Sequence, residues 1–211
     1  MTETKAGPVL HTERLTLTPW EATEDMAVAL YAYAKHKEVG PAAGWKPHET
    51  PRESLDIIKD IFLPTGAFAI RWNETGEIIG SITLEKDSRR QDVKSRELGY
   101  SLARHFWEKG IMTEAGREVM RYGFEDLGLE IISIAIYPLN ERSRSVARKL
   151  GFKLEGTLRM ACRGYDESLR DLMVGSITKE EWEQQKKLII NKAVNAPSHP
   201  PLFIYDSFIH F

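Results

Sequence analysis

The fold is decided by Trp107-Glu-Lys-Gly-Ile-Met-Thr-Glu-Ala115, which joins a strand-like run to a long amphipathic pattern. Residues 96–102 alternate in hydrophobicity, as in a half-buried strand. From Met112 to Leu127 apolar residues recur at helical spacing, and Gly128 ends that pattern. A glycine before a helix lets several unpaired backbone N–H groups point at one anion. We therefore expect a phosphate-binding turn at Gly110, with an ordinary strand-to-helix connection as the alternative.

Upstream of this segment the chain predicts one strand, two helices and an antiparallel meander. The strand covers Glu13 to Thr18, and an amphipathic helix follows from Thr23 to about Lys37. The glycine- and proline-rich stretch from Val39 to His48 is expected to be a loop, before a helix that runs from Pro51 to Phe62. The meander consists of the strand-like runs 67–72, 78–84 and 96–102.

Downstream, the pattern changes to strand, helix and strand. A strand is expected from Ile131 to Tyr137, a short helix from Glu141 to Leu150, and two final strands at Phe152–Leu158 and Leu169–Ile177. This order predicts an α/β (α+β) fold. With 211 residues, the chain is the size of one generous domain.

Composition excludes several classes of protein. The chain has 29 Lys and Arg against 31 Asp and Glu, so its charge of -2 indicates no nucleic-acid partner. A single cysteine, Cys162, excludes an internal disulfide, and the histidines lack metal-ligand spacing, so no metal is expected. Met1 to Leu10 does not read as a signal peptide, and the longest apolar stretch, Met26 to Ala34, is too short to span a membrane. We expect a cytoplasmic protein that does not bind membranes.

The C-terminal segment is expected to be an extension, 183–211, of a domain that covers 1–182. It begins as a charged helix near Glu180 and ends in the apolar run 200–211, which is too apolar for a solvated linker. The extension is therefore expected to pack either on the surface of this domain or on the partner in a homodimer.

The turn lacks the Gly-Lys-Ser or Gly-Lys-Thr ending of an ATP-binding loop and the Gly-x-Gly-x-x-Gly of a dinucleotide fold. It resembles instead the coenzyme A pyrophosphate signature of the GNAT acetyltransferases, Gln/Arg-x-x-Gly-x-Gly/Ala. Trp107 and Met112 depart from that signature. The pattern Trp-x-Lys-Gly-x-x-Thr-Glu-Ala is similar to the branch of ribosomal-protein N-terminal acetyltransferases.

A second segment supports the resemblance independently. Tyr137-Pro-Leu-Asn-Glu-Arg-Ser-Arg-Ser-Val-Ala-Arg-Lys-Leu-Gly-Phe152 resembles the family's Asn-x-x-Ser helix that ends in Lys-Leu-Gly-Phe. The likeness runs from about His11 to Trp182. It implies the GNAT fold, a mixed and mostly antiparallel sheet flanked by helices, with two central strands splayed around the acetyl thioester.

The resemblance implies acetyl-CoA as co-substrate. Asn140 is then expected to hydrogen-bond the pantetheine, in addition to capping its helix. Cations of the same helix, Arg148 among them, are expected near the phosphates, with a solvated helix face as the alternative. The pyrophosphate would be held by the backbone amides of Lys109, Gly110, Ile111, Met112 and Thr113.

The resemblance also implies roles in catalysis. Glu97 is expected to take the proton of the ammonium, directly or through water, although it also fits an exposed strand glutamate. A backbone amide near Leu102 is expected to stabilise the oxyanion. The family's tyrosine, seven residues after the asparagine, is replaced by Ala147, so Ser143 is the expected donor to the leaving sulfur.

Three further residues are weaker candidates. Tyr165 is an alternative donor, although its segment also reads as a plain hairpin turn. Trp45 and His48 are expected to line the acceptor pocket. Cys162 is expected to fill apolar space, so no covalent enzyme intermediate is predicted.

Together these features predict an acetyl-CoA-dependent N-acetyltransferase that transfers acetyl directly to a primary amine. The acceptor is either a protein N-terminus or a small amine such as a polyamine, an amino acid or an antibiotic. The alternative is a catalytically idle relative that binds acyl-CoA and acts as a binding or assembly module, which the replacement of the tyrosine by Ala147 suggests.

Overall fold

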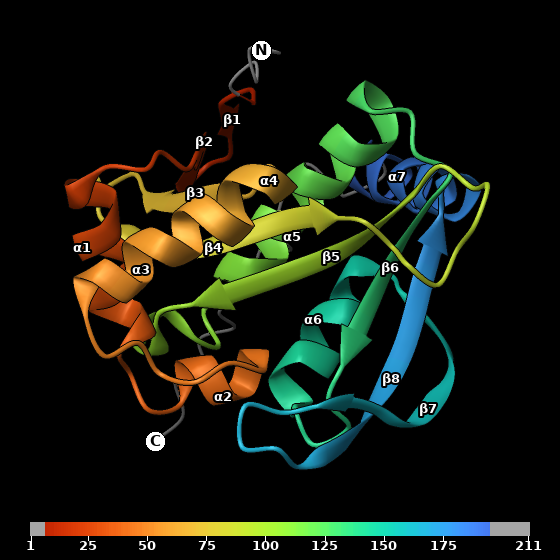
Figure 1. Ribbon diagram of the computed structural model, residues 1–211. Helices are drawn as coiled ribbons and strands as arrows, with labels where there is room; N and C mark the ends of the chain where they lie inside the picture. Colours follow the sequence, from red (N-terminus) through yellow and green to blue (C-terminus); the bar gives the residue numbers. More distant parts are fainter. Residues whose placement is uncertain (1–6, 195–211) are drawn as a thin grey trace, which may run out of the picture.

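The computed structural model describes residues 7–194 of the chain. One eight-stranded sheet, in the order β1-β2-β3-β4-β5-β6-β8-β7, forms its centre (Figure 1). All neighbouring strands are antiparallel except β5 and β6, which are parallel. The expected mixed, mostly antiparallel sheet is confirmed. Its strands are β1 Leu10–His11, β2 Leu15–Pro19, β3 Phe68–Trp72, β4 Ile78–Glu85, β5 Ser95–Leu102, β6 Ile131–Ile136, β7 Lys153–Arg163 and β8 Leu169–Thr178.

Helices cover both faces of the sheet. Along β4, Leu84 lies against the C-terminal extension of α5 at Gly123, whereas Ser81 faces Tyr33 of α1. Because successive strand residues point to opposite faces, α1 and α5 cover opposite sides of β4. The helices are α1 Glu24–Ala34, α2 Val39–Ala43, α3 Pro51–Ile57, α4 Leu63–Thr65, α5 Ile111–Arg121, α6 Glu141–Leu150 and α7 Lys179–Val194.

The central strands β5 and β6 diverge after a short parallel ladder. Their pairing begins at Ser95↔Ile131 and ends at Glu97↔Ser133, although both strands continue (Figure 1). The N–H of Ala103 donates to the Ile79 carbonyl of the neighbouring chain segment at 2.7 Å. Since strand residues alternate, the N–H and C=O groups of Leu102 point the other way, into the gap between β5 and β6. The expected splay is therefore present, and it leaves backbone groups of β5 facing a cleft.

Several element boundaries differ from the sequence-based expectation. Val39 to Ala43 forms the short helix α2 rather than a loop, because Pro41 lies in its first turn, where no N–H is needed, and Gly44 ends it in the left-handed conformation. The helix expected to end at Phe62 passes through a π-helical turn, 58–62, and continues into α4, whereas the helix expected to end at Leu127 finishes in a π-helical turn, 122–126. The two-residue strand β1 was not expected and is too short to show a periodic pattern.

The last hairpin is longer than expected. Strand β7 continues past Leu158 to Arg163 through a register irregularity between Leu158 and Cys162. Within it Met160 adopts a positive φ of 50°, and its N–H donates to the Asp171 carboxylate at 2.8 Å. A side chain thus replaces a ladder hydrogen bond, which alternation of hydrophobicity does not predict.

The expected domain boundary after Trp182 falls inside α7. The Trp182 ring stacks on Phe124 with centroids 5.2 Å apart, and Lys186 pairs with Glu125 at 2.6 Å. Helix α7 therefore packs on the domain on both sides of that boundary. The apolar run 200–211 lies outside the described residues. Within residues 7–194, no helix is both long enough and apolar enough to cross a bilayer.

Candidate functional site

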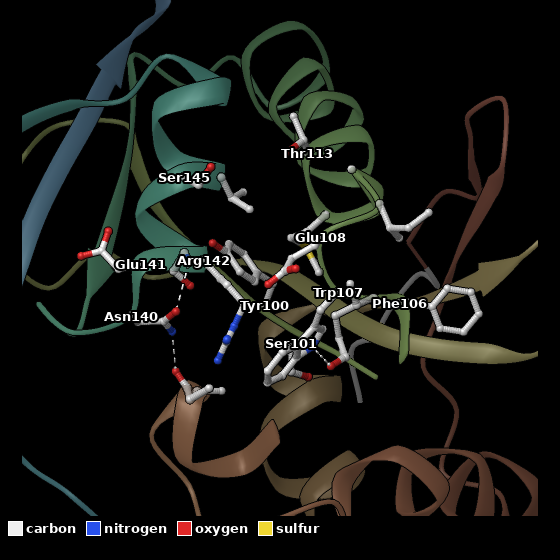
Figure 2. Close-up of a pocket in the computed structure, with 18 of the residues that line it drawn as sticks. Tyr100, Ser101, Phe106, Trp107, Glu108, Thr113, Asn140, Glu141, Arg142 and Ser145 are labelled. Carbon is white, nitrogen blue, oxygen red and sulfur yellow. Dashed lines mark hydrogen bonds between the residues drawn. The ribbon is translucent and has the colours of Figure 1, made fainter. Parts of the chain in front are cut away.

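Two adjoining cavities occupy the cleft. The larger, of about 340 Å³, lies between β5, the start of α5 and α6 (Figure 2). The smaller, of about 190 Å³, lies in the gap between β5 and β6 and reaches Glu97. Tyr100, Asn140 and Ser143 line both cavities, so the two spaces meet at these side chains.

The turn before α5 is built around Gly110. Its φ of 77° is left-handed, a conformation that favours glycine, and it caps α5 without a side-chain hydrogen bond. The amides of Ile111, Met112 and Thr113 occupy the first turn, where an α-helix has no internal acceptors for its N–H groups. Gly110 and these three residues line the larger cavity. The arrangement suits an anion at the positive end of the α5 dipole.

An ion pair from the N-terminal strands holds this turn in place. Arg14 contacts Glu114 of α5 at 2.6 Å and donates to the Lys109 carbonyl at 3.2 Å. Burial would raise the pKa of Glu114, but hydrogen bonds from Thr12 and Arg14 outweigh it and lower that pKa. The Lys109 side chain itself lies beside Phe106, with Nζ 5.6 Å from the ring centre. Lys109 itself lines neither cavity, so the expected contact of its amide with the pyrophosphate stays a prediction.

Trp107 connects β5 to α6 across the larger cavity. Two guanidinium groups lie over its indole, those of Arg104 at 4.8 Å and Arg142 at 4.2 Å from the ring centre. Its Nε1 donates to the Leu102 carbonyl at 2.7 Å (Figure 2). The Leu102 carbonyl is thereby occupied, and its N–H stays directed into the cleft. The contact of Trp107 with Arg142 was not predicted, because the two residues are distant in the sequence.

Asn140 caps α6 and also anchors α2. Its Oδ1 accepts from the Ser143 N–H at 3.1 Å, and its Nδ2 donates to the Ala42 carbonyl at 3.0 Å (Figure 2). One N–H of the amide remains for a ligand. Among the cations of this helix, Arg142 and Lys149 line the larger cavity. Arg148 is exposed and lies away from the lining, so its expected contact with phosphate stays a prediction.

Two carboxylates face each other in the smaller cavity. Glu97 of β5 is the register partner of Glu85 of β4, and Glu97 is ion-paired with Arg89. A Cβ added at Gly99 would lie 3.3 Å from Glu85 Oε1, so the glycine leaves room for that carboxylate. Burial raises the pKa of both glutamates, and the charge of Glu97 raises that of Glu85 further. Glu85 was missed because only strand register reveals the pair.

Arg89 is held by a buried charge network around Asp87. The Asp87 carboxylate accepts hydrogen bonds from Ser133 and Arg90, each at 2.7 Å, and lies 3.5 Å from Arg89. Burial alone would raise the pKa of Asp87, but these hydrogen bonds outweigh that effect and lower it. Arg90 also reaches Glu155 of β7 at 2.6 Å. The network therefore ties the β4–β5 connection to β6 and β7 beside the smaller cavity.

The remaining predicted residues do not line either cavity. Tyr165 is 46% exposed, and Arg170 lies 5.5 Å from its ring. Trp45 packs on His48 with ring centres 5.0 Å apart. His48 is buried against Ser54 Oγ at 2.8 Å, and burial lowers its pKa. Their roles toward the acceptor stay predictions.

Residues 7–194 contain no group of three or more His, Cys, Asp or Glu side chains arranged to hold a metal ion.

Comparison with known proteins assigns the family. The model of the acetyltransferase (GNAT) domain matches residues 14–153. The uncharacterized N-acetyltransferase p20 of Bacillus licheniformis is 32% identical over 181 residues, which cover 82% of this chain and 97% of that protein. A ribosomal-protein-S5-alanine acetyltransferase from Vibrio fischeri has the same fold, with a TM-score of 0.65, 22% identity and coverage of 83% of this chain and 99% of that chain. The acetyltransferase MccE of microcin C7 self immunity, solved with acetyl-CoA and AMP, gives a TM-score of 0.67 at 21% identity over 79% of this chain and 93% of that one. The chain belongs to the GNAT family of N-acetyltransferases.

Proposed function

We propose that this enzyme binds acetyl-CoA and a primary amine together and transfers the acetyl group directly between them. The observation that carries the proposal is the Gly110 turn, whose free amides face a cavity that continues through the splayed strands to Glu97. The anion-binding turn suits the pyrophosphate of the coenzyme. The carboxylate at the other end of the cleft suits the ammonium group of the acceptor, which must lose a proton. The acetyl-CoA-bound structure of a family relative with this fold supports the choice of co-substrate.

The coenzyme is proposed to lie along the larger cavity. The amides of residues 110–113 receive its pyrophosphate, and Arg142 and Lys149 add positive charge at the mouth. Asn140 and the Leu102 N–H face the pantetheine and the thioester from opposite walls of the cleft. The thioester then lies where the two cavities meet.

The acceptor is proposed to enter from the smaller cavity. Its ammonium group loses a proton to Glu97, whose raised pKa brings it nearer that of a base useful at neutral pH. The resulting amine attacks the carbonyl carbon, and the Leu102 N–H hydrogen-bonds the developing oxyanion. Ser143 lines both cavities and is proposed to hydrogen-bond the leaving sulfur.

The acceptor is a protein N-terminus or a small amine. The ribosomal-protein acetyltransferase among the structures of the same fold favours the N-terminus. The smaller cavity, which Glu97 lines, does not distinguish between the two classes.

Calorimetric titration with acetyl-CoA, followed by release of free thiol with a panel of N-terminal peptides, polyamines and amino acids, tests the proposal. Binding together with release that depends on one acceptor class supports it and identifies the class. Binding without release from any acceptor favours the idle relative. Absence of acetyl-CoA binding contradicts the proposal.

A further inference from the structure

The hydroxyl group of Tyr100 is a buried polar group without a hydrogen-bond partner among the described residues. Buried hydroxyl groups in folded proteins are almost always paired, because an unpaired one has lost water and gained nothing in exchange. Such an exception needs an explanation, and a bound ligand that supplies the missing acceptor is one. The position of Tyr100 shows which ligand atom that is.

Tyr100 lies where the two cavities meet. It follows the last β5–β6 pair, Glu97↔Ser133, and it lines both spaces. Its register partner on β4 is Ile82, on the face of the sheet that α5 covers, whereas Glu97 points to the opposite face. Figure 2 shows the Tyr100 side chain reaching from β5 towards α6. The phenol therefore approaches the thioester position from the side opposite to the amine.

Helix α6 presents little else that donates a proton at this point. The Ser143 hydroxyl lies close enough to lower the pKa of Tyr100, although it is not in hydrogen-bonding geometry to the phenol. Ala147, one turn later on the same helix, is buried and has no polar atom in its side chain. Helical side chains point towards the N-terminus, so a larger residue at 147 would reach back to the turn of Ser143. The phenol of Tyr100 reaches this turn from the opposing strand.

We infer that Tyr100 is a further catalytic residue, whose hydroxyl donates a hydrogen bond to the thioester sulfur as the carbon–sulfur bond breaks. The inference rests on the proposed function. The amine nitrogen forms the new bond to the carbonyl carbon, the sulfur leaves with the electron pair of the broken bond, and the proton lost by the nitrogen ends on the sulfur through Glu97 and solvent. Tyr100 keeps its own proton throughout.

The environment of Tyr100 suits a donor that stays neutral. Burial raises the pKa of Tyr100 to about 12, against a lowering influence of Ser143. The phenol thus remains protonated at every pH at which the enzyme works. A neutral donor that is fixed before the reaction stabilises developing negative charge without reorganisation of the site.

Tyr100→Phe removes only the hydroxyl group, and Tyr33→Phe is its matched control. The Tyr33 hydroxyl is also buried and unpaired, but Tyr33 lines neither cavity. Because each substitution removes an unpaired hydroxyl, neither variant should melt at a lower temperature than the wild type. A change found only in Tyr100→Phe then reports on the site and not on folding.

The deciding measurement is the affinity of coenzyme A and of desulfo-coenzyme A between pH 7 and 9.5, by calorimetry. A thiol ionises above about pH 8.5, and a hydrogen bond to an anion is much stronger than one to a neutral group. We expect wild type and Tyr33→Phe to bind coenzyme A about tenfold more tightly at high pH, with no change for the desulfo compound. Tyr100→Phe should lose this increase, and its kcat for thiol release should fall about tenfold with a similar KM for acetyl-CoA.

An unchanged increase in Tyr100→Phe, with coenzyme binding intact, would overturn the role of Tyr100 and leave the proposed function standing. Loss of the increase in both Phe variants would also overturn it, because the effect would then not belong to the site. Absence of coenzyme A binding by the wild type would overturn the proposed function together with this inference.

Discussion

The larger cavity presents backbone N–H groups and cationic side chains, whereas the smaller cavity presents two carboxylates from neighbouring strands. The first depends on the conformation of one turn, centred on Gly110. The second depends on the register of the sheet and on a buried charge network around Asp87. Amides do not titrate, but carboxylates do. The difference therefore implies that, among the groups of the protein, those on the acceptor side of the cleft titrate with pH, whereas the amides that face the coenzyme do not.

The largest effect is expected from Asp87→Asn. This change removes the charge that faces Arg89 and Arg90 in the interior, and breaking a buried ion pair costs about 3 kcal/mol or more. Because hydrogen bonds lower the pKa of Asp87 in the folded protein, its contribution to stability is present above the unfolded pKa of about 3.9 and is lost as pH falls through the folded value. Urea unfolding at pH 7 and pH 3 measures both effects.

The control for that prediction is Asp92→Asn, the same chemical change at an exposed position of the same connection. It should leave the free energy of unfolding within about 0.5 kcal/mol of wild type. If Asp87→Asn is as stable as Asp92→Asn at pH 7, the network does not organise the acceptor side.

Glu97→Gln should lower kcat/KM about 100-fold, the usual contribution of a general base. Because burial raises the pKa of Glu97, the wild-type rate should fall with decreasing pH at a higher pH than for an ordinary glutamate. Glu85→Gln removes a neighbouring negative charge and should move this decline to lower pH, with kcat within a fewfold of wild type. The profiles of kcat/KM against pH for the three proteins test both statements.

The opposite assignment gives the opposite pattern. If Glu85→Gln abolishes turnover while Glu97→Gln retains the pH profile, the base is Glu85, the carboxylate without an ion pair among the described residues. Arg89 would then serve to keep Glu97 ionised, and the carboxylate that takes the proton of the acceptor would come from β4 and not from β5.

Gly110→Val should weaken acetyl-CoA binding by about tenfold to 100-fold. A β-branched residue at a φ of 77° is strained by about 1–3 kcal/mol, and relief of that strain would turn the amides away from the anion. Gly66→Val is the control, since Gly66 has a similar φ of 66° and open space around it, far from the turn in the sequence. Both variants should melt earlier, but only Gly110→Val should lose affinity in calorimetry. Equal affinities would place the pyrophosphate elsewhere.

The sequence predicted the coenzyme side better than the acceptor side for a physical reason. A glycine before a helix specifies local geometry, so the Gly110 turn and the Asn140 cap could be placed from a few adjacent residues. Helix α2 was taken for a loop because glycine and proline usually break helices, although here Gly40 and Pro41 lie in its first turn and Gly44 caps its end.

The acceptor side is formed by residues far apart in the sequence. Glu85 and Glu97 meet only through the β4–β5 register, and Asp87 reaches Ser133 only because β6 pairs with the start of β5. Tyr100 gave no signal in the sequence, because an unpaired hydroxyl is recognised only when its surroundings are known. Trp45 and His48 were expected at the acceptor pocket from their loop, yet His48 is buried against Ser54.

The smallest effect is expected from Arg142→Ala, which tests whether the coenzyme side needs any side chain in addition to its amides. Arg142 covers one face of Trp107 and lines the larger cavity, so its loss should weaken acetyl-CoA binding about two- to fivefold. Arg144→Ala is the matched control, because Arg144 is exposed, pairs with Glu141 and does not line the cavity. Added salt should narrow the gap between wild type and Arg142→Ala, since part of the attraction between a guanidinium and phosphates is screened. If Arg142→Ala lost as much acetyl-CoA affinity as Gly110→Val, the guanidinium group, and not the turn, would hold the pyrophosphate. The coenzyme side would then depend on side chains as the acceptor side does, and the contrast between the two cavities would fail.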